Sequence, residues 1–168
     1  MSATSAVGVP AQSRRHDAGT SRDSDPRLPR HRLAALMDAG TLELISADDD
    51  SGMVAATGLV HGSRVVAFCS DASLMGGAMG DAGCRVVVEA YHRALADGVP
   101  IIGLWHSGGA RLAEGVLSLH AVGRIFHAMT QASQHRRDVG GPAGVQLEGG
   151  ALVEDTLHQR VHVVGAPA

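Results

Sequence analysis

The chain contains 168 residues, which is enough for one modest domain. Its formal net charge is −3 with the histidines taken as neutral, so there is no electrostatic reason to expect nucleic acid as a partner. No apolar run is long enough to span a bilayer, and the N-terminus lacks the charged-then-apolar pattern of a signal peptide. We therefore expect neither a membrane nor a nucleic-acid partner.

Composition indicates how the interior is built. Hydrophobic residues make up 45 % of the chain and aromatic residues 2 %, so the core must consist mainly of Val, Leu, Ala and Met. The 22 glycines predict many tight turns or close backbone approaches. Cys69 and Cys84 form neither a zinc-ligand set nor a disulfide framework, so we expect two reduced, buried thiols in a cytoplasmic protein.

The first half of the chain divides into a polar leader and an orderly segment. Residues 1–29 are rich in Ser, Ala, Arg, Asp and Pro and are expected to be disordered. Residues 31–38 predict a short helix that is closed by Gly40, with Leu33, Leu36 and Met37 on one face. A short strand is expected over 42–45. Two β-type runs, 53–60 and 64–69, are joined by His61-Gly62-Ser63 and predict a hairpin.

Helices and strands then alternate around glycine-rich turns. Residues 75–80 read Met-Gly-Gly-Ala-Met-Gly, and 84–96 follow as a helix with Val87, Val88, Tyr91 and Leu95 at helical spacing. Residues 100–104 are a buried strand. The longest helix is expected over 111–132, with Leu112, Val116, Leu119, Ile125 and Met129 near one face. This order indicates an α/β domain.

The most informative stretch, residues 105–116, reads Trp-His-Ser-Gly-Gly-Ala-Arg-Leu-Ala-Glu-Gly-Val. It follows a strand and precedes a helix, so Gly108 and Gly109 would leave backbone N–H groups uncovered at a helix N-terminus. Such a site favours a phosphate or an enolate oxyanion. The alternative is that both glycines merely shape the turn. Ser107 is a poor candidate nucleophile, because Trp105 occupies the position where a nucleophile elbow has glycine.

Other side chains near these turns have structural interpretations. His120 and His127 are compatible with one helix face but lack the further ligands that a metal site requires, so no metal is expected. His106 could line the site, although a structural role is favoured. Met75 and Met79 are expected in the core.

The ordered set of motifs resembles the carboxyltransferase (β) subunit of biotin-dependent acyl-CoA carboxylases of the acetyl-/propionyl-CoA type. The resemblance spans residues 32–133 and rests on the segments 50–55, 68–71, 75–80, 101–111 and 114–116. The Trp-His-Ser-Gly-Gly version is similar to that of short actinobacterial members that make malonyl-CoA. The resemblance implies a crotonase-like fold of ββα units, with residues 30–133 as an incomplete N-terminal carboxyltransferase domain that binds acyl-CoA.

The resemblance also implies roles for the glycine motifs. Gly108 and Gly109 match the family's oxyanion pair, which would stabilise a thioester enolate. Acyl-CoA contacts are expected from the two motifs, at Gly76, Gly77, Ser107, Ala110 and Arg111. For Arg111 a charge near the CoA phosphates and a solvated helix residue stay open as alternatives.

The implied reaction moves a carboxyl group from carboxybiotin to the α-carbon of an acyl-CoA, giving malonyl- or methylmalonyl-CoA for fatty-acid biosynthesis. The chain would bind no cofactor directly, since biotin is presented by a carrier subunit that works with biotin carboxylase, and its ureido group can accept the α-proton. A full-length subunit would be a homo-oligomer.

After Ser133 the resemblance fades. Residues 134–138 interrupt the family pattern, while 140–144 and 160–163 are faint remnants of a glycine turn and a strand. We interpret 134–168 as a divergent tail that is truncated, rearranged or frameshifted, and expect the chain alone to be inactive. The alternatives are a non-catalytic remnant that at most binds acyl-CoA, and a related hydratase or decarboxylase subunit. A hydratase would need carboxylates near its second glycine turn, and Glu148, Glu154 and Asp155 match nothing well.

Overall fold

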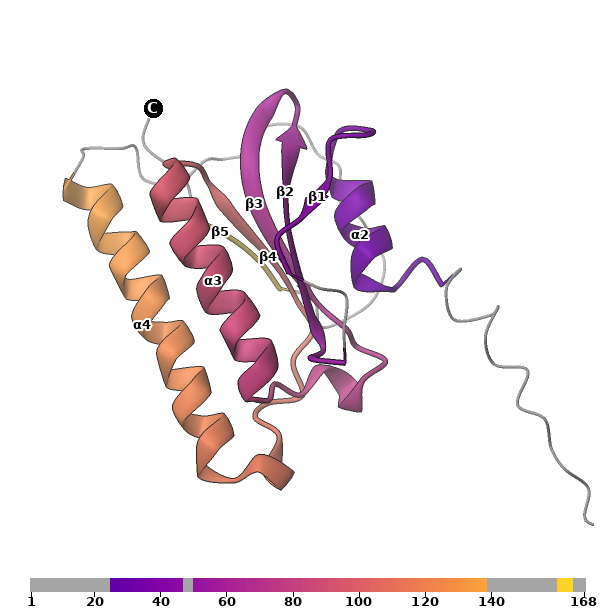
Figure 1. The fold of residues 1–168 in the computed structure, drawn as a ribbon, viewed down its shortest axis with the longest axis vertical. Helices are drawn as coiled ribbons and strands as arrows, with labels where there is room; N and C mark the ends of the chain where they lie inside the picture. Colours follow the sequence, from indigo (N-terminus) through magenta and orange to yellow (C-terminus); the bar gives the residue numbers. More distant parts are fainter. Residues whose placement is uncertain (1–24, 47–49, 139–159, 165–168) are drawn as a thin grey trace, which may run out of the picture.

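A computed structural model describes residues 25–46, 50–138 and 160–164 of the chain. The expected disorder of the leader, the glycine remnant at 140–144 and the three tail carboxylates lie outside these residues. The described elements, in chain order, are α2 (Pro29–Leu36), β1 (Glu43–Leu44), β2 (Met53–Val60), β3 (Ser63–Ser70), the 3₁₀ turn η1 (Met75–Gly77), α3 (Asp81–Asp97), β4 (Ile101–Trp105), the 3₁₀ turn η2 (Leu112–Glu114), α4 (Val116–Asp138) and β5 (Arg160–Val164) (Figure 1).

The strands form one mixed sheet in the order β1-β2-β3-β4-β5. The β3–β4 pair is parallel, and the other pairs are antiparallel. The predicted strands and the β2–β3 hairpin are confirmed, as is the strand at 160–163. His61 and Gly62 make the hairpin turn with φ values of 50° and 77°, the left-handed pairing that suits a two-residue loop.

Helices cover both faces of the sheet. Helices α3 and α4 lie side by side on one face and α2 lies on the other (Figure 1). Side chains of β2 and β3 therefore alternate between two cores and not between core and solvent. Towards α3 and α4 the sheet contributes Met53, Ala55, Val66, Phe68 and Ile101; towards α2 it contributes Val54, Ala56, Val65, Ala67, Cys69, Ile102 and Leu104.

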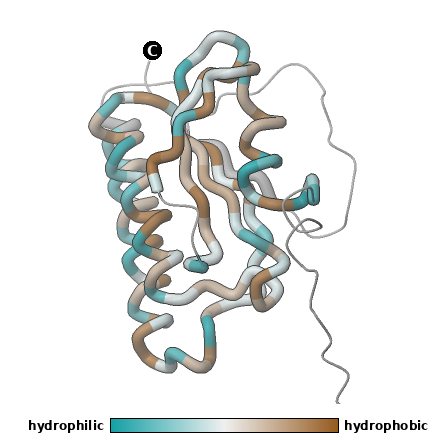
Figure 2. The backbone as a smooth tube through the Cα atoms, turned by 45° about the vertical axis from the view of Figure 1, so that its right-hand side comes forward, coloured by the Kyte–Doolittle hydropathy of each residue, from teal (hydrophilic) through white to brown (hydrophobic). Residues whose placement is uncertain are grey.

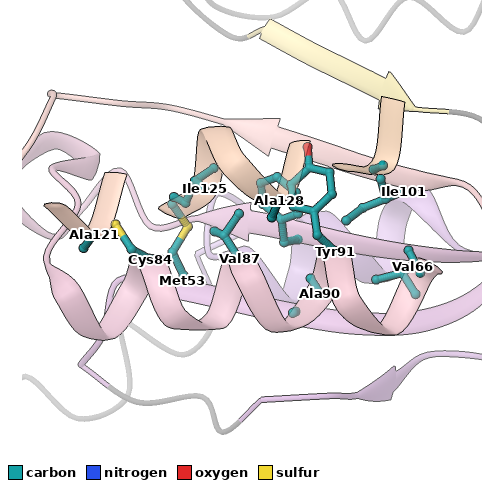
Figure 3. Close-up of a cluster of buried hydrophobic side chains, with 14 residues drawn as sticks. Met53, Val66, Cys84, Val87, Ala90, Tyr91, Ile101, Ala121, Ile125 and Ala128 are labelled. Atoms are coloured by element: carbon teal, nitrogen blue, oxygen red, sulfur yellow. The ribbon is translucent and has the colours of Figure 1, made fainter. Parts of the chain in front are cut away.

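The larger core lies between the sheet and the α3–α4 layer (Figure 3). Tyr91 is 1 % exposed, and its ring packs near Phe68 with centroids 6.0 Å apart. Most of its other members are small or aliphatic, as the low aromatic content predicts. Figure 2 shows the apolar strands in the interior and mixed hydropathy along the helices.

The predicted helix 31–38 is displaced. It begins at Pro29 and ends at Leu36, with Met37 extended, so Gly40 does not close it. The chain turns after Met37 because the Asp38 carboxylate accepts hydrogen bonds from the hairpin amides of His61 (3.1 Å) and Gly62 (2.8 Å).

The predicted helix 111–132 is wrong at its start and in part of its buried face. Helix α4 begins at Val116 and continues through the residues that were expected to interrupt the pattern, to Asp138. Leu112, Val116 and Leu119 are 93 %, 79 % and 64 % exposed. The buried stripe consists of Ser118, Ala121, Ile125, Ala128 and Ala132. Ile125 is therefore buried as predicted, and Met129 packs against the same core. Small residues at helical spacing let α4 approach α3 closely.

Within the described residues, no helix is both long enough and apolar enough to cross a bilayer.

Candidate active site

Two glycine-rich loops lie at one edge of the sheet. The first, residues 71–80, follows β3, and the second, residues 106–115, follows β4. Because β3 and β4 are parallel, both loops leave the carboxyl ends of adjacent strands, at the lower end of the molecule in Figure 1. This is the edge at which open α/β sheets bind ligands.

Main-chain hydrogen bonds join the two loops. The Met79 amide donates to the Gly109 oxygen at 2.8 Å, and the Arg111 amide donates to the Met79 oxygen at 2.9 Å. Together they form an isolated parallel bridge between Met79 and Ala110. The loops therefore behave as one unit whose spacing is set by backbone geometry.

Two glycines permit this close approach. A Cβ on Gly77 would lie 1.8 Å from the His106 oxygen, and Gly77 has a φ of +75°. A Cβ on Gly108 would lie 3.0 Å from the Gly76 oxygen. Gly77 and Gly108 are therefore needed where backbone packs on backbone.

The amides of Gly108 and Gly109, which were predicted to bind the oxyanion, differ in their hydrogen bonding. The Gly109 N–H donates to Ser107 Oγ at 3.1 Å. For the Gly108 N–H, no hydrogen bond is found among the described residues, and Gly108 is exposed. The predicted helix N-terminus is wrong, because η2 and Gly115 separate the glycines from α4. The Gly108 N–H can donate to an anionic oxygen without help from the α4 dipole.

Buried Ser70 fixes the start of the second loop. Its Oγ accepts a hydrogen bond from the His106 amide at 2.6 Å and donates to the His106 oxygen at 2.9 Å. His106 is thus anchored through its main chain, consistent with a structural role. Sequence analysis missed Ser70, although a polar residue that ends a buried strand is a usable signal.

Arg111 is directed inward. Its side chain is 16 % exposed. Its Nε donates to the Ala78 oxygen at 3.0 Å and its Nη2 to the Ser51 oxygen at 3.1 Å. The solvated interpretation of Arg111 is therefore wrong, because its guanidinium is held by main-chain oxygens of two other segments.

The sequence indicates no role for Glu114 beyond its place in the motif, yet its side chain completes the start of α3. The Asp81 amide donates to Glu114 Oε2 at 2.7 Å, and the N-cap residue Gly80 has no side chain to do this. Arg111 Nη1 lies 3.7 Å from Glu114 Oε1. Asp81 in turn pairs with Arg85 and with Arg124 of α4.

The remaining candidates take ordinary positions. His120 and His127 are exposed on α4, and no described residues form a group of three potential metal ligands. Met79 packs against the core, but Met75 is 64 % exposed, so its predicted burial is wrong. The cause is the left-handed backbone at Met75, with a φ of 49°, at the start of the turn.

Both cysteines are buried, as predicted. Burial raises the pKa of the Cys69 thiol to about 11, and burial likewise raises the pKa of the Cys84 thiol to about 11. Neither thiol is a candidate nucleophile, since the thiolate is the reactive form.

Comparison with known families decides the assignment. Residues 28–137 match the model of the carboxyl transferase domain. The chain belongs to the carboxyl transferase family. It is 49 % identical, over 84 % of its length, to the biotin-dependent acetyl-/propionyl-coenzyme A carboxylase beta6 subunit of Mycobacterium tuberculosis. It is 56 % identical, over 66 % of its length, to the propionyl-CoA carboxylase beta chain of Rhodococcus erythropolis.

The chain spans 31 % and 23 % of the lengths of these two relatives. The fold is similar to that of transcarboxylase 12S, solved as a hexamer with methylmalonyl-coenzyme A and methylmalonic acid bound. That similarity has a TM-score of 0.59 and 30 % identity, and covers 62 % of this chain and 23 % of the other. The predicted family and the crotonase-like α/β fold of a partial domain are confirmed.

Proposed function

We propose that the two joined glycine loops form the acyl-CoA half of a carboxyltransferase site of the acetyl-/propionyl-CoA type. The observation that supports this most directly is the Met79–Ala110 bridge, which holds the exposed Gly108 amide beside the first loop. The activities for which the relatives are named supply the reaction class, and the loop geometry supplies the oxyanion donor.

The reaction requires hydrogen-bond donors that stabilise a developing negative charge. Removing a proton from the α-carbon of a thioester places charge on the carbonyl oxygen, and backbone amides fixed at that position stabilise it. The carboxyl donor, carboxybiotin on a separate carrier, is a substrate in this scheme: its N–carboxyl bond breaks, the new C–C bond forms at the α-carbon, and the α-proton passes to the ureido group. No side-chain nucleophile is required.

The predicted roles are refined by the geometry. Gly108 is the first donor that we assign, and the Gly109 amide becomes a second one if Ser107 Oγ releases it. Gly76, Ser107 and Ala110 stay proposed acyl-CoA contacts at the loop surface. Gly77 lies beneath the His106 oxygen, so we give it a shaping role.

The wider assignments belong to the same proposal. They are malonyl- or methylmalonyl-CoA as product, a role in fatty-acid biosynthesis, work with biotin carboxylase and a biotin carrier, homo-oligomer formation and a cytoplasmic location. The division at residue 133 also stays a proposal; α4 and the family match both extend a few residues beyond it.

Binding can be followed with the chain's own fluorophore. Trp105 is the single tryptophan, ends β4 next to the second loop, and packs edge-on against Phe68 with ring centroids 4.9 Å apart. We expect saturable fluorescence changes with acetyl-CoA and with CoA thiol. Acetyl-CoA should bind about three- to tenfold more tightly, the value of one net hydrogen bond to the thioester oxygen. Equal affinities, or no binding, would contradict the proposal.

A further inference from the structure

We propose that Arg111 and Glu114 are positioning residues that set the spacing of the two glycine loops and thereby aim the Gly108 amide at the thioester oxygen. This inference rests on the proposed function for its consequence in binding, but the positioning itself concerns only the chain's own contacts. Neither residue touches the ligand in this scheme.

Several segments of the chain meet at Arg111. Its side chain donates to Ala78 in the first loop and to Ser51 before β2. Its main-chain amide donates to Met79, and its main-chain oxygen accepts from Ser118 of α4 at 3.0 Å. One residue of the second loop therefore links the first loop, the start of β2 and α4.

The chemistry of guanidinium explains why arginine suits this position. Its planar fork offers donors in several fixed directions at once, whereas a lysine ammonium is a single point on a flexible stem. The Arg111 guanidinium packs closely against Gly52, since a Cβ on Gly52 would lie 3.0 Å from Arg111 Nη2. A shorter side chain, or one with a single charged nitrogen, could reach the Ala78 oxygen or the Ser51 oxygen but not both.

The carboxylate of Glu114 makes contacts through both of its oxygens. One carboxylate oxygen accepts the Asp81 amide that begins α3, and the other lies 3.7 Å from Arg111 Nη1. The carboxylate also sits against the Cα of Gly80, where a Cβ would lie 2.1 Å from Oε1. Glu114 thus ties the end of the second loop to the residue at which the first loop becomes a helix.

Together these contacts flank the loop bridge on both sides. The bonds between Met79, Gly109 and Arg111 lie between the Ala78 contact and the Glu114 contact. Without the guanidinium, two connections remain among the described residues: the main-chain bridge between Met79 and the second loop, and the hydrogen bond from the Asp81 amide to Glu114. We therefore expect the loops to separate more often while the sheet stays intact.

Hydrogen exchange of the 168-residue chain tests the positioning without any ligand. We expect Arg111→Met to raise the exchange rates of the amides of Met79 and residue 111 by at least tenfold, with the β2–β3 ladder unchanged. Glu114→Gln keeps the acceptor for Asp81 but removes the charge, so it should give a smaller increase. The matched control is Arg85→Met, because Arg85 pairs with Asp81 on the surface and contacts neither loop.

The second readout is the preference for acetyl-CoA over CoA thiol, measured by Trp105 fluorescence. A purely structural residue would alter both affinities together. We expect Arg111→Met to remove the preference while CoA binding changes by less than twofold. Arg111→Lys should restore part of the preference, and Arg85→Met should retain all of it.

The outcomes separate the two proposals. Unchanged exchange at Met79 and residue 111 in a folded Arg111→Met chain would overturn the positioning role. A wild-type chain with no preference for acetyl-CoA would overturn the proposed function, and the exchange rates would still decide the positioning. If Arg111→Met loses protection throughout the sheet, Arg111→Lys and Glu114→Gln decide: wild-type exchange at the bridge in both would overturn the inference.

Discussion

The main-chain oxygen of His106 lies directly over the Cα of Gly77, so that a Cβ built on Gly77 would be 1.8 Å from it. The contact joins the loops that follow two parallel strands, and buried Ser70 Oγ donates to the same His106 oxygen and accepts from the His106 amide. The first glycine loop can therefore pack against the second in one way, which fixes the position of the Gly108 amide.

Gly77→Ala should lower the unfolding free energy by about 2–4 kcal/mol, because the new Cβ meets backbone that cannot move aside and Gly77 has positive φ. Gly76→Ala is the matched control: Gly76 also has a positive φ, +63°, but nothing lies within 4 Å of its Cβ position. It should lose about 1 kcal/mol, the cost of left-handed backbone alone. Urea unfolding measures both, and equal losses would contradict the close packing of the loops.

Gly108→Val should abolish the preference for acetyl-CoA over CoA thiol, since its side chain would meet the Gly76 oxygen and turn the amide away. In any preparation that turns over, the loss in rate should be about a hundredfold, the scale for one oxyanion donor. Ser107→Ala should reduce both far less, because it leaves the Gly108 donor in place and frees the Gly109 amide. A loss with Ser107→Ala equal to that with Gly108→Val would indicate a direct role for the hydroxyl.

Stability should fall at alkaline pH. The pKa values of Cys69 and Cys84 are raised by burial from 9.0 to about 11, and that of Tyr91 from 10.0 to about 12. The folded state therefore holds these protons more tightly than the unfolded state, and its advantage is complete below pH 9 and is lost as pH rises through 11 to 12. Urea midpoints measured from pH 7 to 11 should decline above pH 9.

The variant Cys69→Ala/Cys84→Ala provides the control for this pH dependence. The urea midpoint of this variant should fall less steeply between pH 9 and pH 11 than that of the wild type. The remaining slope is due to Tyr91 and surface groups. The same thiols should react with a disulfide reagent at neutral pH only after denaturation, because both are buried. Rapid labelling of the native chain would show that the core between the sheet and α3 opens readily.

The buried face of α4 can be tested with two aliphatic residues of similar size. Ile125 is 2 % exposed and Leu119 is 64 % exposed. Ile125→Ala should cost about 2–4 kcal/mol of unfolding free energy, and Leu119→Ala less than about 0.5 kcal/mol. Equal losses in chemical denaturation would contradict the structure and support the face that residue spacing alone predicts, on which Leu119 and Ile125 lie together.

Much of the fold follows from local sequence, because turns act through nearby backbone. His61 and Gly62 form the hairpin turn, and Gly98 ends α3 with a left-handed φ of 64°. The start of α4 does not, since Leu112 and Val116 fit a helical period while Gly115 lies between them with φ 55° and ψ −130°, which ends the 3₁₀ turn. Spacing cannot reveal such a break when the flanking apolar residues are exposed.

The candidate site was predictable only where its residues form local sequence motifs. The glycine motifs and the family were recognisable from residues 75–80 and 105–116. The role of Arg111 was not, because its partners are main-chain oxygens, one of them 60 residues away in sequence at Ser51. Main-chain acceptors leave no residue-type signature, so three-dimensional proximity was needed to find them.

The most direct test of the central claim observes the thioester itself. Acetyl-CoA labelled with ¹³C at the carbonyl should show a downfield shift of that carbon on binding to the wild-type chain, since a hydrogen bond from the Gly108 amide polarises the C=O group. The shift should vanish in Gly108→Val and persist in Ser107→Ala. A bound thioester whose carbonyl resonance stays at its free position would contradict the account.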